Sequence, residues 1–418
     1  MLRTAICLQK KMWSSTTKEL VAICQMTANN DLEKNFEAAR GMIERAGNRN
    51  CKMVFLPECF DYIGNSKEET IGLAMSSEGD YMNRYRELAK KHKLWLSLGG
   101  LHNKKGTEPL PLNTHLIIDD TGATRAEYNK LHLFDLEIPG KVRLMESEFS
   151  RRGTEMIPPV DTPIGKIGLG ICYDMRFPEL ALWNRKKGAH IMAYPSAFTL
   201  TTGLAHWEAL LRARAIETQS YVIASAQTGS SNPKRQSYGH SIVVDPWGAV
   251  VAQCSERVDM AFAEVDIGYV EEIRQLQPVM AHRRSDLYSL HVNEKSTDTT
   301  DMVFEKYPIA ADTIFYRTAH SFAFVNLKPV LDGLAKKVQK MLESFYNVTS
   351  STVCVQDGKD AGQTVSHVHV HILPRKPTDF GGDTDALYKH LAENDKKEKK
   401  ERTHEEMKEE AEKYKNAM

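Results

Sequence analysis

Three side chains in the first two thirds of the chain are of the types that acyl transfer requires. Cys172 follows the apolar run Ile-Gly-Leu-Gly-Ile, Glu58 ends the run Val-Phe-Leu-Pro, and Lys130 stands within Tyr-Asn-Lys-Leu-His. A cysteine nucleophile needs a base to take its proton, and the tetrahedral intermediate needs positive charge beside its oxyanion. Each residue also has an ordinary alternative, because most buried cysteines only pack, and Glu and Lys mostly lie on the surface. Together the three are a candidate acyl-transfer site.

Read together, the three segments resemble the Glu–Lys–Cys triad of the nitrilase superfamily, in order and in surroundings. The matching text is Leu-Pro-Glu58, Asn-Lys130-Leu-His-Leu-Phe-Asp, and Gly-Ile-Cys172-Tyr-Asp-Met-Arg-Phe-Pro-Glu. The resemblance covers residues 19–290 and implies an αββα sandwich that pairs with other subunits through its sheet and helix layers. It also implies that Glu58 is the general base, that Lys130 supports the tetrahedral intermediate, and that Cys172 forms a thioester.

The same resemblance implies two further site groups. Glu146, in Leu-Met-Glu-Ser, matches a family carboxylate that positions the lysine or the attacking water. The backbone N–H of Tyr173 would be the second donor to the oxyanion. We therefore expect both groups beside Cys172.

The residues after Cys172 are similar to the Nit branch of the superfamily. They read Phe-Pro-Glu-Leu and, further on, His-Trp-Glu-Ala-Leu-Leu-Arg-Ala-Arg. Members of that branch hydrolyse amides of short carboxylic acids, including deaminated glutathione. Arg176 is a candidate clamp for a substrate carboxylate, because a guanidinium binds a carboxylate through two parallel hydrogen bonds. An ion pair of Arg176 with Glu179 or Asp174 is an equally good interpretation.

A second candidate site is the run His367-Val-His369-Val-His371. Strict alternation places all three imidazoles on one face of a strand. Two chemistries fit: zinc binding, since His is a common zinc ligand, and transfer at phosphorus with one His as nucleophile. The preceding amides, glycines and Thr, from Gln356 to Thr364, favour a chain that passes close to phosphates.

This stretch resembles the histidine-triad family in its fragile-histidine-triad (Fhit) branch. The match rests on Phe-Val-Asn-Leu-Lys-Pro-Val, Val-Gln-Asp-Gly, Ala-Gly-Gln-Thr-Val, the three histidines, and Leu-Pro-Arg-Lys. It implies hydrolysis of dinucleoside polyphosphates, typically diadenosine triphosphate to AMP and ADP. In that reaction His369 attacks the α-phosphate and forms a nucleotidyl-histidine. The supporting residues implied are His367 and His371 beside the leaving group, Gln356 and Gln363 at the phosphates, and Asn326 near the ribose.

The second half departs from the family pattern at Gly333. The family continues there into a strand, a loop and most of a helix, whereas here Gly333 runs directly into Leu-Ala-Lys-Lys-Val-Gln-Lys-Met-Leu. We expect one strand and part of a helix to be absent, through a skipped exon, a gene-model error or a real variant. The alternative to a second enzyme is therefore a nucleotide-sensing module without turnover.

The pattern of strands, helices and polar stretches predicts an α/β chain with a larger domain followed by a smaller α+β domain. The predicted parts are a tail or transit peptide, a nitrilase-type domain, a polar linker, a histidine-triad domain, and a charged C-terminal helix or tail: residues 1–18, 19–290, 291–301, 302–390 and 391–418.

Composition narrows the class of protein. The net charge of +0 over 418 residues gives no bulk attraction to nucleic acid, and no apolar run is long enough to cross a membrane. The seven cysteines are scattered without a CxxC pair, which indicates a reducing compartment and no structural zinc site. The basic, acid-free start fits a mitochondrial transit peptide as well as a cytoplasmic tail.

The order nitrilase then histidine triad resembles invertebrate fusion proteins of these two families. That resemblance implies a homotetramer acting on small molecules. We expect no cofactor in a protein-borne site, with a divalent cation, Mg or Mn, assisting nucleotide hydrolysis by neutralising phosphate charge.

Overall fold

The structure is a computed structural model in which the chain divides into two compact units, residues 1–290 and 291–418. Unit 1 is described almost throughout, and unit 2 in separate segments. The described residues are 18–138, 142–288, 290, 292, 302–304, 307–317, 322–324, 335–355, 370–379 and 403–417.

Unit 1 contains two six-stranded sheets. The first has the order β16 (Asp259–Val265), β1 (Glu19–Gln25), β2 (Met53–Leu56), β3 (Trp95–Asn103), β4 (Leu112–Ile118) and β5 (Thr124–Asn129). The second has the order β15 (Val250–Gln253), β14 (Ile242–Val244), β11 (Tyr221–Ala224), β10 (Ile191–Ala193), β9 (Gly165–Leu169) and β8 (Val160–Thr162).

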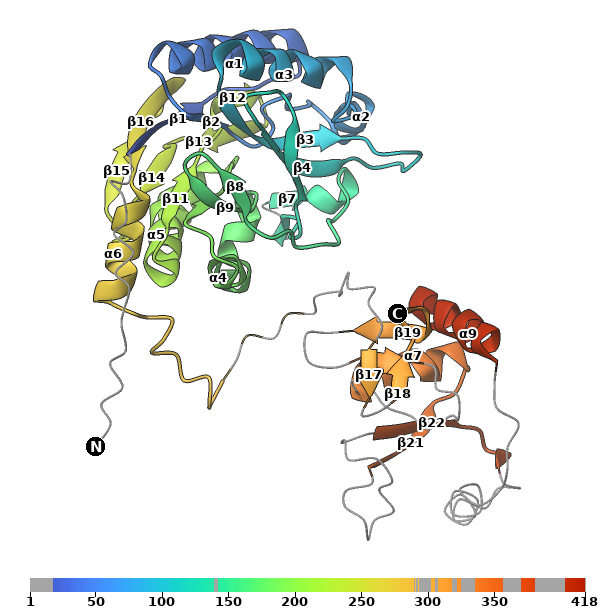
Figure 1. Cartoon of the computed structure of the whole chain (residues 1–418). Helices are drawn as coiled ribbons and strands as arrows, with labels where there is room; N and C mark the ends of the chain where they lie inside the picture. Colours follow the sequence, from blue (N-terminus) through green and yellow to red (C-terminus); the bar gives the residue numbers. More distant parts are fainter. Residues whose placement is uncertain are drawn as a thin grey trace, which may run out of the picture. The chain divides into compact units, whose positions relative to one another are not determined.

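Helices cover the outer face of each sheet (Figure 1). α1 (Leu32–Asn48) and α3 (Asp80–His92) pack over the first sheet, and α4 (Pro178–Lys186) and α5 (Leu200–Thr218) pack against the second. This confirms the αββα sandwich.

Local chemistry explains where α1 begins and which face it buries. The Asp31 side chain accepts hydrogen bonds from the first-turn N–H groups, as an N-cap should. Phe36, Ala39 and Ile43 recur at helical spacing and are buried in the core shared with the first sheet.

The rest of unit 1 consists of short elements around the sandwich. They are α2 (Lys67–Gly72), β6 (Asp135–Ile138), β7 (Val142–Met145), the 3₁₀ helices η1 (Glu146–Glu148) and η2 (Cys172–Arg176), β12 (Thr228–Asn232), β13 (Arg235–Tyr238) and α6 (Ile267–Leu276).

Buried polar contacts fasten the two sheets to each other near the ends of their strands. Ser225 donates from Oγ to the carbonyl of Phe55 at 2.8 Å, and Gln227 donates from Nε2 to the carbonyl of Glu58 at 2.9 Å. These bonds fix the end of β2 against the segment that follows β11.

The described strands of unit 2 form three antiparallel pairs. They are β17 (Met302–Phe304) with β18 (Tyr307–Ile309), β19 (Ile314–Arg317) with β20 (Phe322–Phe324), and β21 (Ser350–Val355) with β22 (Val370–Arg375). The other elements are η3 (Ala311–Thr313), α7 (Ala335–Phe345) and α9 (His404–Ala417). This unit is the smaller α+β domain expected, and α7 starts two residues after Gly333.

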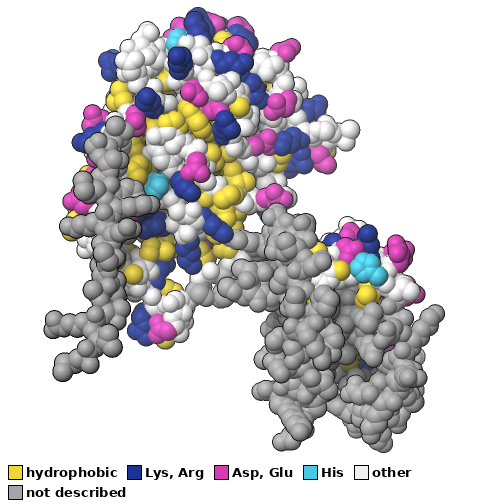
Figure 2. Space-filling model, in the orientation of Figure 1, with side chains coloured by type: hydrophobic (Ala, Val, Ile, Leu, Met, Phe, Trp, Pro, Cys, Tyr) yellow, Lys and Arg dark blue, Asp and Glu magenta, His cyan; other side chains and the backbone are white. Residues whose placement is uncertain are grey.

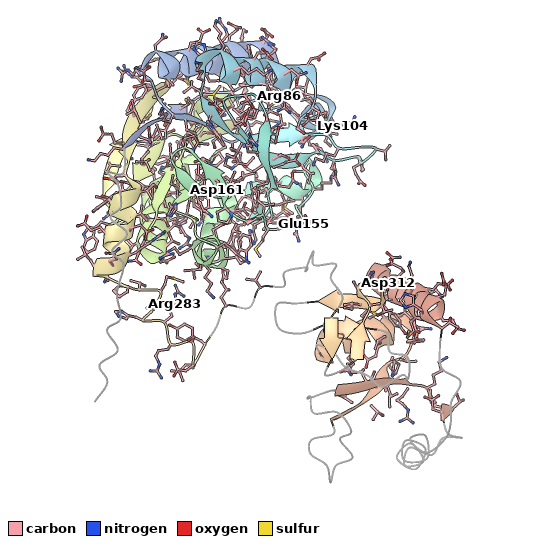
Figure 3. All side chains as sticks on the ribbon, in the orientation of Figure 1. Arg86, Lys104, Glu155, Asp161, Arg283 and Asp312 are labelled. Atoms are coloured by element: carbon pink, nitrogen blue, oxygen red, sulfur yellow. The ribbon has the colours of Figure 1, made fainter. Side chains whose placement is uncertain are left out.

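The charged C-terminal helix has a buried side that its composition conceals. Met407, Ala411 and Tyr414 of α9 join a core cluster with α7 and β22. Their spacing of three and four residues puts them on one face. On the exposed side, Asp312 (labelled in Figure 3) pairs with His404 at 3.1 Å.

Surface charge agrees with the neutral composition. Positive and negative side chains are interspersed over the visible face of unit 1 (Figure 2). Among the described residues, no helix has both the length and the apolar character needed to span a membrane.

Candidate active site

Glu58, Lys130 and Glu146 meet in the interior of unit 1. Glu58 follows β2, Lys130 follows β5, and Glu146 opens η1. Lys130 Nζ donates to Glu58 Oε1 at 2.9 Å and to Glu146 at 3.0 Å (Oε1) and 2.8 Å (Oε2). All three side chains are buried. The structure thus brings together one buried ammonium and two buried carboxylates.

The charges of this cluster hold one another in the ionised state. Burial alone would raise the pKa of Glu58, but Lys130 and hydrogen bonds hold it below its usual value of 4.5. Burial would likewise lower the pKa of Lys130, yet Glu146 and Glu58 raise it well above its usual value. Glu58 is therefore a carboxylate at neutral pH and can accept a proton.

Cys172 is the first residue of η2, where the chain leaves β9. Its backbone has φ of +47°, a left-handed conformation that is strained for a residue other than glycine. Its N–H donates to the carbonyl of Pro195 at 2.9 Å. Burial and the charge of Glu58 raise the pKa of the thiol, and a hydrogen bond links the thiol to Glu58. The resting nucleophile is a protonated thiol beside its base.

Asn113 is a site neighbour that the sequence did not reveal. Its Nδ2 donates to Glu58 Oε1 at 2.9 Å and to Glu146 Oε1 at 3.1 Å. It lies on β4, in Pro-Leu-Asn-Thr-His, and no local signal separates it from other asparagines. Only the pairing of the strands places it between the two carboxylates.

Asp174 was missed as well, although it stands two residues after Cys172. Its fully buried carboxylate accepts from Tyr128 Oη at 2.7 Å and from the Ile171 N–H at 2.9 Å, and it lies 2.7 Å from His132 Nδ1. It therefore fastens the Cys172 segment to the residues on either side of Lys130. The sequence suggests Asp174 only as an ion-pair partner for Arg176.

Tyr173 and Arg176 lie on η2 with Cys172. Within the described residues, no acceptor is recorded for the Tyr173 N–H, as is usual in the first turn of a helix. Arg176 donates to His206 Nδ1 at 3.2 Å, and its guanidinium lies 5.5 Å from the ring centroid of Phe198. In the described part of the chain, no ion pair joins Arg176 to Glu179 or Asp174 within 4.0 Å, and whether Arg176 binds a substrate carboxylate stays a prediction.

A second charged pair lies in the segment that follows Glu58. His102 Nδ1 is 3.1 Å from Asp61, its backbone N–H donates to Asp61 at 2.8 Å, and its ring stacks on Tyr62. Burial alone would lower the pKa of His102, but Asp61 and Cys59 raise it to about 10. The pair anchors the loop that carries the base.

We predict that His102→Gln destabilises unit 1 by about 3 kcal/mol near neutral pH, because it leaves the Asp61 carboxylate buried without its counter-charge. The folded pKa of His102 lies above its ordinary value of 6.5, so the pair's stabilisation is complete below pH 6.5 and lost as the pH rises through about 10. Urea unfolding across this range should show a declining stability for the wild type and a flatter curve for the variant. Exposed His282→Gln is the control, and equal slopes in wild type and His102→Gln would contradict the assignment.

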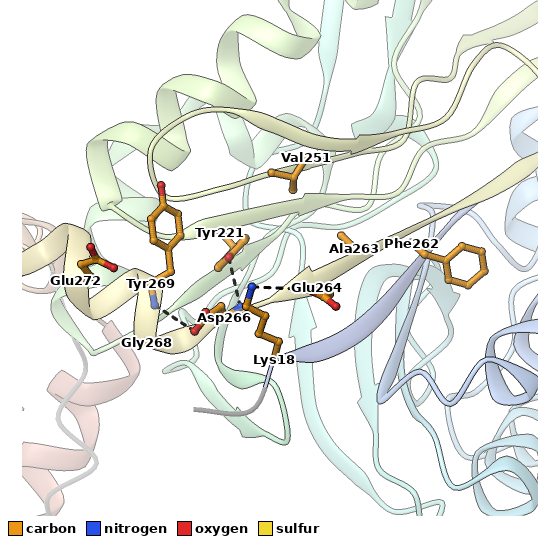
Figure 4. Close-up of a pocket in the computed structure, with 10 residues that line it drawn as sticks. All are labelled: Lys18, Tyr221, Val251, Phe262, Ala263, Glu264, Asp266, Gly268, Tyr269 and Glu272. Carbon is orange, nitrogen blue, oxygen red and sulfur yellow. Dashed lines mark hydrogen bonds and ion pairs between the residues drawn. The ribbon is translucent and has the colours of Figure 1, made fainter. Parts of the chain in front are cut away.

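One hollow among the described residues is separate from this site (Figure 4). It has a volume of about 640 Å³ beside β16 and α6, and none of the predicted site residues lines it. Lys18 pairs with Glu264 across it at 3.8 Å, and the Asp266 N–H donates to Tyr221 Oη at 3.3 Å. Its polar groups thus bond largely to one another.

The second candidate site falls mostly outside the described residues. The predicted residues that lie outside them are Asn326, Gln356, Gln363, His367 and His369. The backbone of His371 is described: it lies in β22, opposite Cys354 of β21. No group of three or more potential metal ligands occurs in the described part of the chain, which does not include the whole histidine run.

Comparison with known proteins matches each half of the chain to a protein family. The carbon–nitrogen hydrolase family matches residues 20–275, and the HIT domain family matches residues 331–378. The deaminated glutathione amidase of Mus musculus is 46% identical over 298 residues, which cover 69% of this chain and 92% of that protein.

Relatives named as fusion proteins span both units. The nitrilase and fragile histidine triad fusion protein NitFhit of Caenorhabditis elegans is 64% identical over 432 residues, covering 97% of this chain and 98% of that protein. Its crystal structure matches with a TM-score of 0.80 and 62% identity, covering 97% of this chain and 100% of that one. The alignment of 432 positions is longer than this chain of 418 residues, so some of the relative's residues have no counterpart here. The chain is thus a hydrolase of the carbon–nitrogen (nitrilase) family with a HIT domain after it, and it belongs to the nitrilase and histidine-triad fusion proteins.

Proposed function

We propose that unit 1 hydrolyses the amide bond of a short, anionic carboxamide, deaminated glutathione or a close analogue, through a thioester on Cys172. The observation that carries the proposal is the buried contact of Glu58, Lys130 and Cys172, with an ionised base beside a protonated thiol. The amidase named among the relatives suggests the substrate.

The proposed reaction has two halves. Glu58 takes the thiol proton as Sγ attacks the amide carbon, and Lys130 Nζ with the Tyr173 N–H stabilises the oxyanion. The C–N bond then breaks, the proton passes from Glu58 to the leaving amine, and a thioester remains. Glu58 next takes a proton from water, which attacks the thioester, and Cys172 leaves as the thiol. Glu146 keeps Lys130 charged and in place throughout.

The substrate's carboxylate would bind Arg176. The guanidinium stands four residues after the nucleophile, against His206 and the rings of Tyr173 and Phe198. Stacking against rings leaves its edge able to donate to a carboxylate. An amide without a negative charge would lack this contact.

We predict that Arg176→Gln lowers kcat/KM for an anionic amide by roughly 10- to 100-fold, the cost of losing charge-assisted hydrogen bonds to substrate. Most of the effect should fall on KM. The methyl ester of the same substrate should be hydrolysed equally by both proteins. Arg40→Gln, on the exposed side of α1, is the charge-matched control, and an equal loss on acid and ester would exclude the clamp.

The proposed reaction class is tested by offering the purified full-length chain deaminated glutathione and a nitrile of similar size. The proposal expects release of amine from the amide and no turnover of the nitrile. Turnover of the nitrile alone would overturn it.

We propose a second activity for unit 2 because the HIT match, residues 331–378, contains all three histidines. In this proposal His369 attacks the α-phosphate of diadenosine triphosphate, and His367 and His371 support the leaving group. Mg or Mn would assist by neutralising phosphate charge. The alternative remains a nucleotide-sensing module without turnover. A homotetramer and a cytoplasmic or mitochondrial location also stay proposals, since the basic start lies outside the described residues.

A further inference from the structure

The Glu58 carboxylate is held from two sides through one oxygen. Oε1 accepts from Lys130 Nζ and from Asn113 Nδ2, each at 2.9 Å. These two donors occupy both lone pairs of Oε1. Cys172 also hydrogen-bonds to this carboxylate, and we infer that its thiol donates to Oε2, because Oε1 already accepts two bonds.

Asn113 binds the second carboxylate at the same time. Its Nδ2 also donates to Glu146 Oε1 at 3.1 Å, so one amide group spans the two acids. Its own Oδ1 is buried and accepts no hydrogen bond among the described residues. Both bonds that its Nδ2 donates go to carboxylates that also bind Lys130.

We propose that Asn113 is a positioning residue that keeps Glu58 Oε2 directed at the Cys172 thiol while Lys130 turns to the substrate oxyanion. Lys130 cannot keep its full hydrogen bond to Glu58 Oε1 and also stabilise the oxyanion, because it already binds both carboxylate oxygens of Glu146. Asn113 holds the Glu58 carboxylate in place when the Lys130–Glu58 hydrogen bond weakens. This inference rests on the proposed amidase mechanism and names a further residue for it.

A neutral amide suits this position better than a charged group. A second cation would lower the pKa of Glu58 further and make it a weaker base, whereas a third carboxylate would raise it by repulsion. The amide supplies two donors and leaves the charge of the cluster unchanged.

The test uses the full chain without any substrate. Iodoacetamide alkylates Cys172 at a rate that depends on proton removal by Glu58, and peptide mass spectrometry follows the modified residue. Asn113→Ala should slow alkylation about tenfold, the effect of one lost hydrogen bond to a charged group. Asn113→Asp should shift the acid limb of the rate profile upward by about one pH unit, because a third carboxylate repels Glu58.

The control is Asn184→Ala. Asn184 is also buried and donates to the carbonyl of Leu180 within α4, and among the described residues its Oδ1 accepts no hydrogen bond. It should leave the alkylation rate unchanged even where it lowers the melting temperature. Should Asn113→Ala fail to fold, Asn113→Ser removes the same donors with a smaller cavity.

The outcomes separate the two proposals. Slowed alkylation in the Asn113 variants supports the positioning role of Asn113. If the wild type also hydrolyses none of the amides offered, the amidase proposal is wrong but the positioning role still holds. Alkylation of Asn113→Ala at the wild-type rate, or an equal slowing in Asn184→Ala, overturns the positioning role.

Discussion

Replacing Cys172 with alanine should abolish amide hydrolysis, by a factor on the order of 10⁴ or more, as expected when a covalent nucleophile is removed. The thiol is the only group in the described site that combines nucleophilicity with a hydrogen bond to an ionised base. Without it, Glu58 could still activate water, but no thioester would form. Loss of amine release in a continuous assay is the measurement.

The alanine variant should remain folded. Alanine has the same Cβ as cysteine, so the strained backbone at φ +47° costs the variant about what it costs the wild type. Cys254→Ala is the matched control, because Cys254 is equally buried and forms no part of the site. Retention of more than a tenth of the activity in Cys172→Ala would show that the nucleophile is a different residue.

The second large effect concerns unit 2, where we predict poor cleavage of diadenosine triphosphate by the chain as it stands. The sequence departs from the family pattern at Gly333, where we expect one strand and part of a helix to be absent. Strand edges without a partner leave N–H and C=O groups unpaired. Inserting the strand and helix segment of the C. elegans relative after Gly333 should therefore restore turnover by at least about tenfold, since 1.4 kcal/mol of recovered folding or binding energy suffices for that.

The restored protein then tests the histidines. His369→Asn should remove turnover again, by on the order of 10⁴-fold, because the nucleotidyl-histidine cannot form. Formation of AMP, followed by chromatography, is the readout. If the chain without the insert already works at the restored rate, the segment is dispensable. If the restored protein binds nucleotide but never cleaves it, the sensing module is the correct interpretation.

The sequence predicted the parts of the site that are carried by strand ends. Glu58 and Cys172 each follow an apolar run, Lys130 follows β5, and strands in one sandwich present residues at their ends along a shared edge. Glu146 was placed by family resemblance and does contact Lys130. The catalytic roles of these residues stay predictions until activity is measured.

Asn113 and Asp174 could not be predicted in the same way. The place of Asn113 depends on the register of β4 against β3, in which it lies opposite His102. Asp174 acts through Tyr128 and His132, which are distant in sequence and arrive by folding. The buried face of α9 could not be predicted from composition, because Lys and Glu dominate the helix. Three residues on one face, Met407, Ala411 and Tyr414, are enough to pack it against the core of unit 2.

In the proposed reaction Cys172 carries the acyl group as a thioester, and peptide mass mapping can detect that thioester during turnover. Full-length protein would be quenched in acid during turnover of an excess of the amide, digested, and searched for peptides that carry the acyl mass. We predict the acyl group on the peptide that contains Cys172, and its absence from the peptides of Cys59 and Cys254. An acyl group on any other residue during turnover would contradict the account.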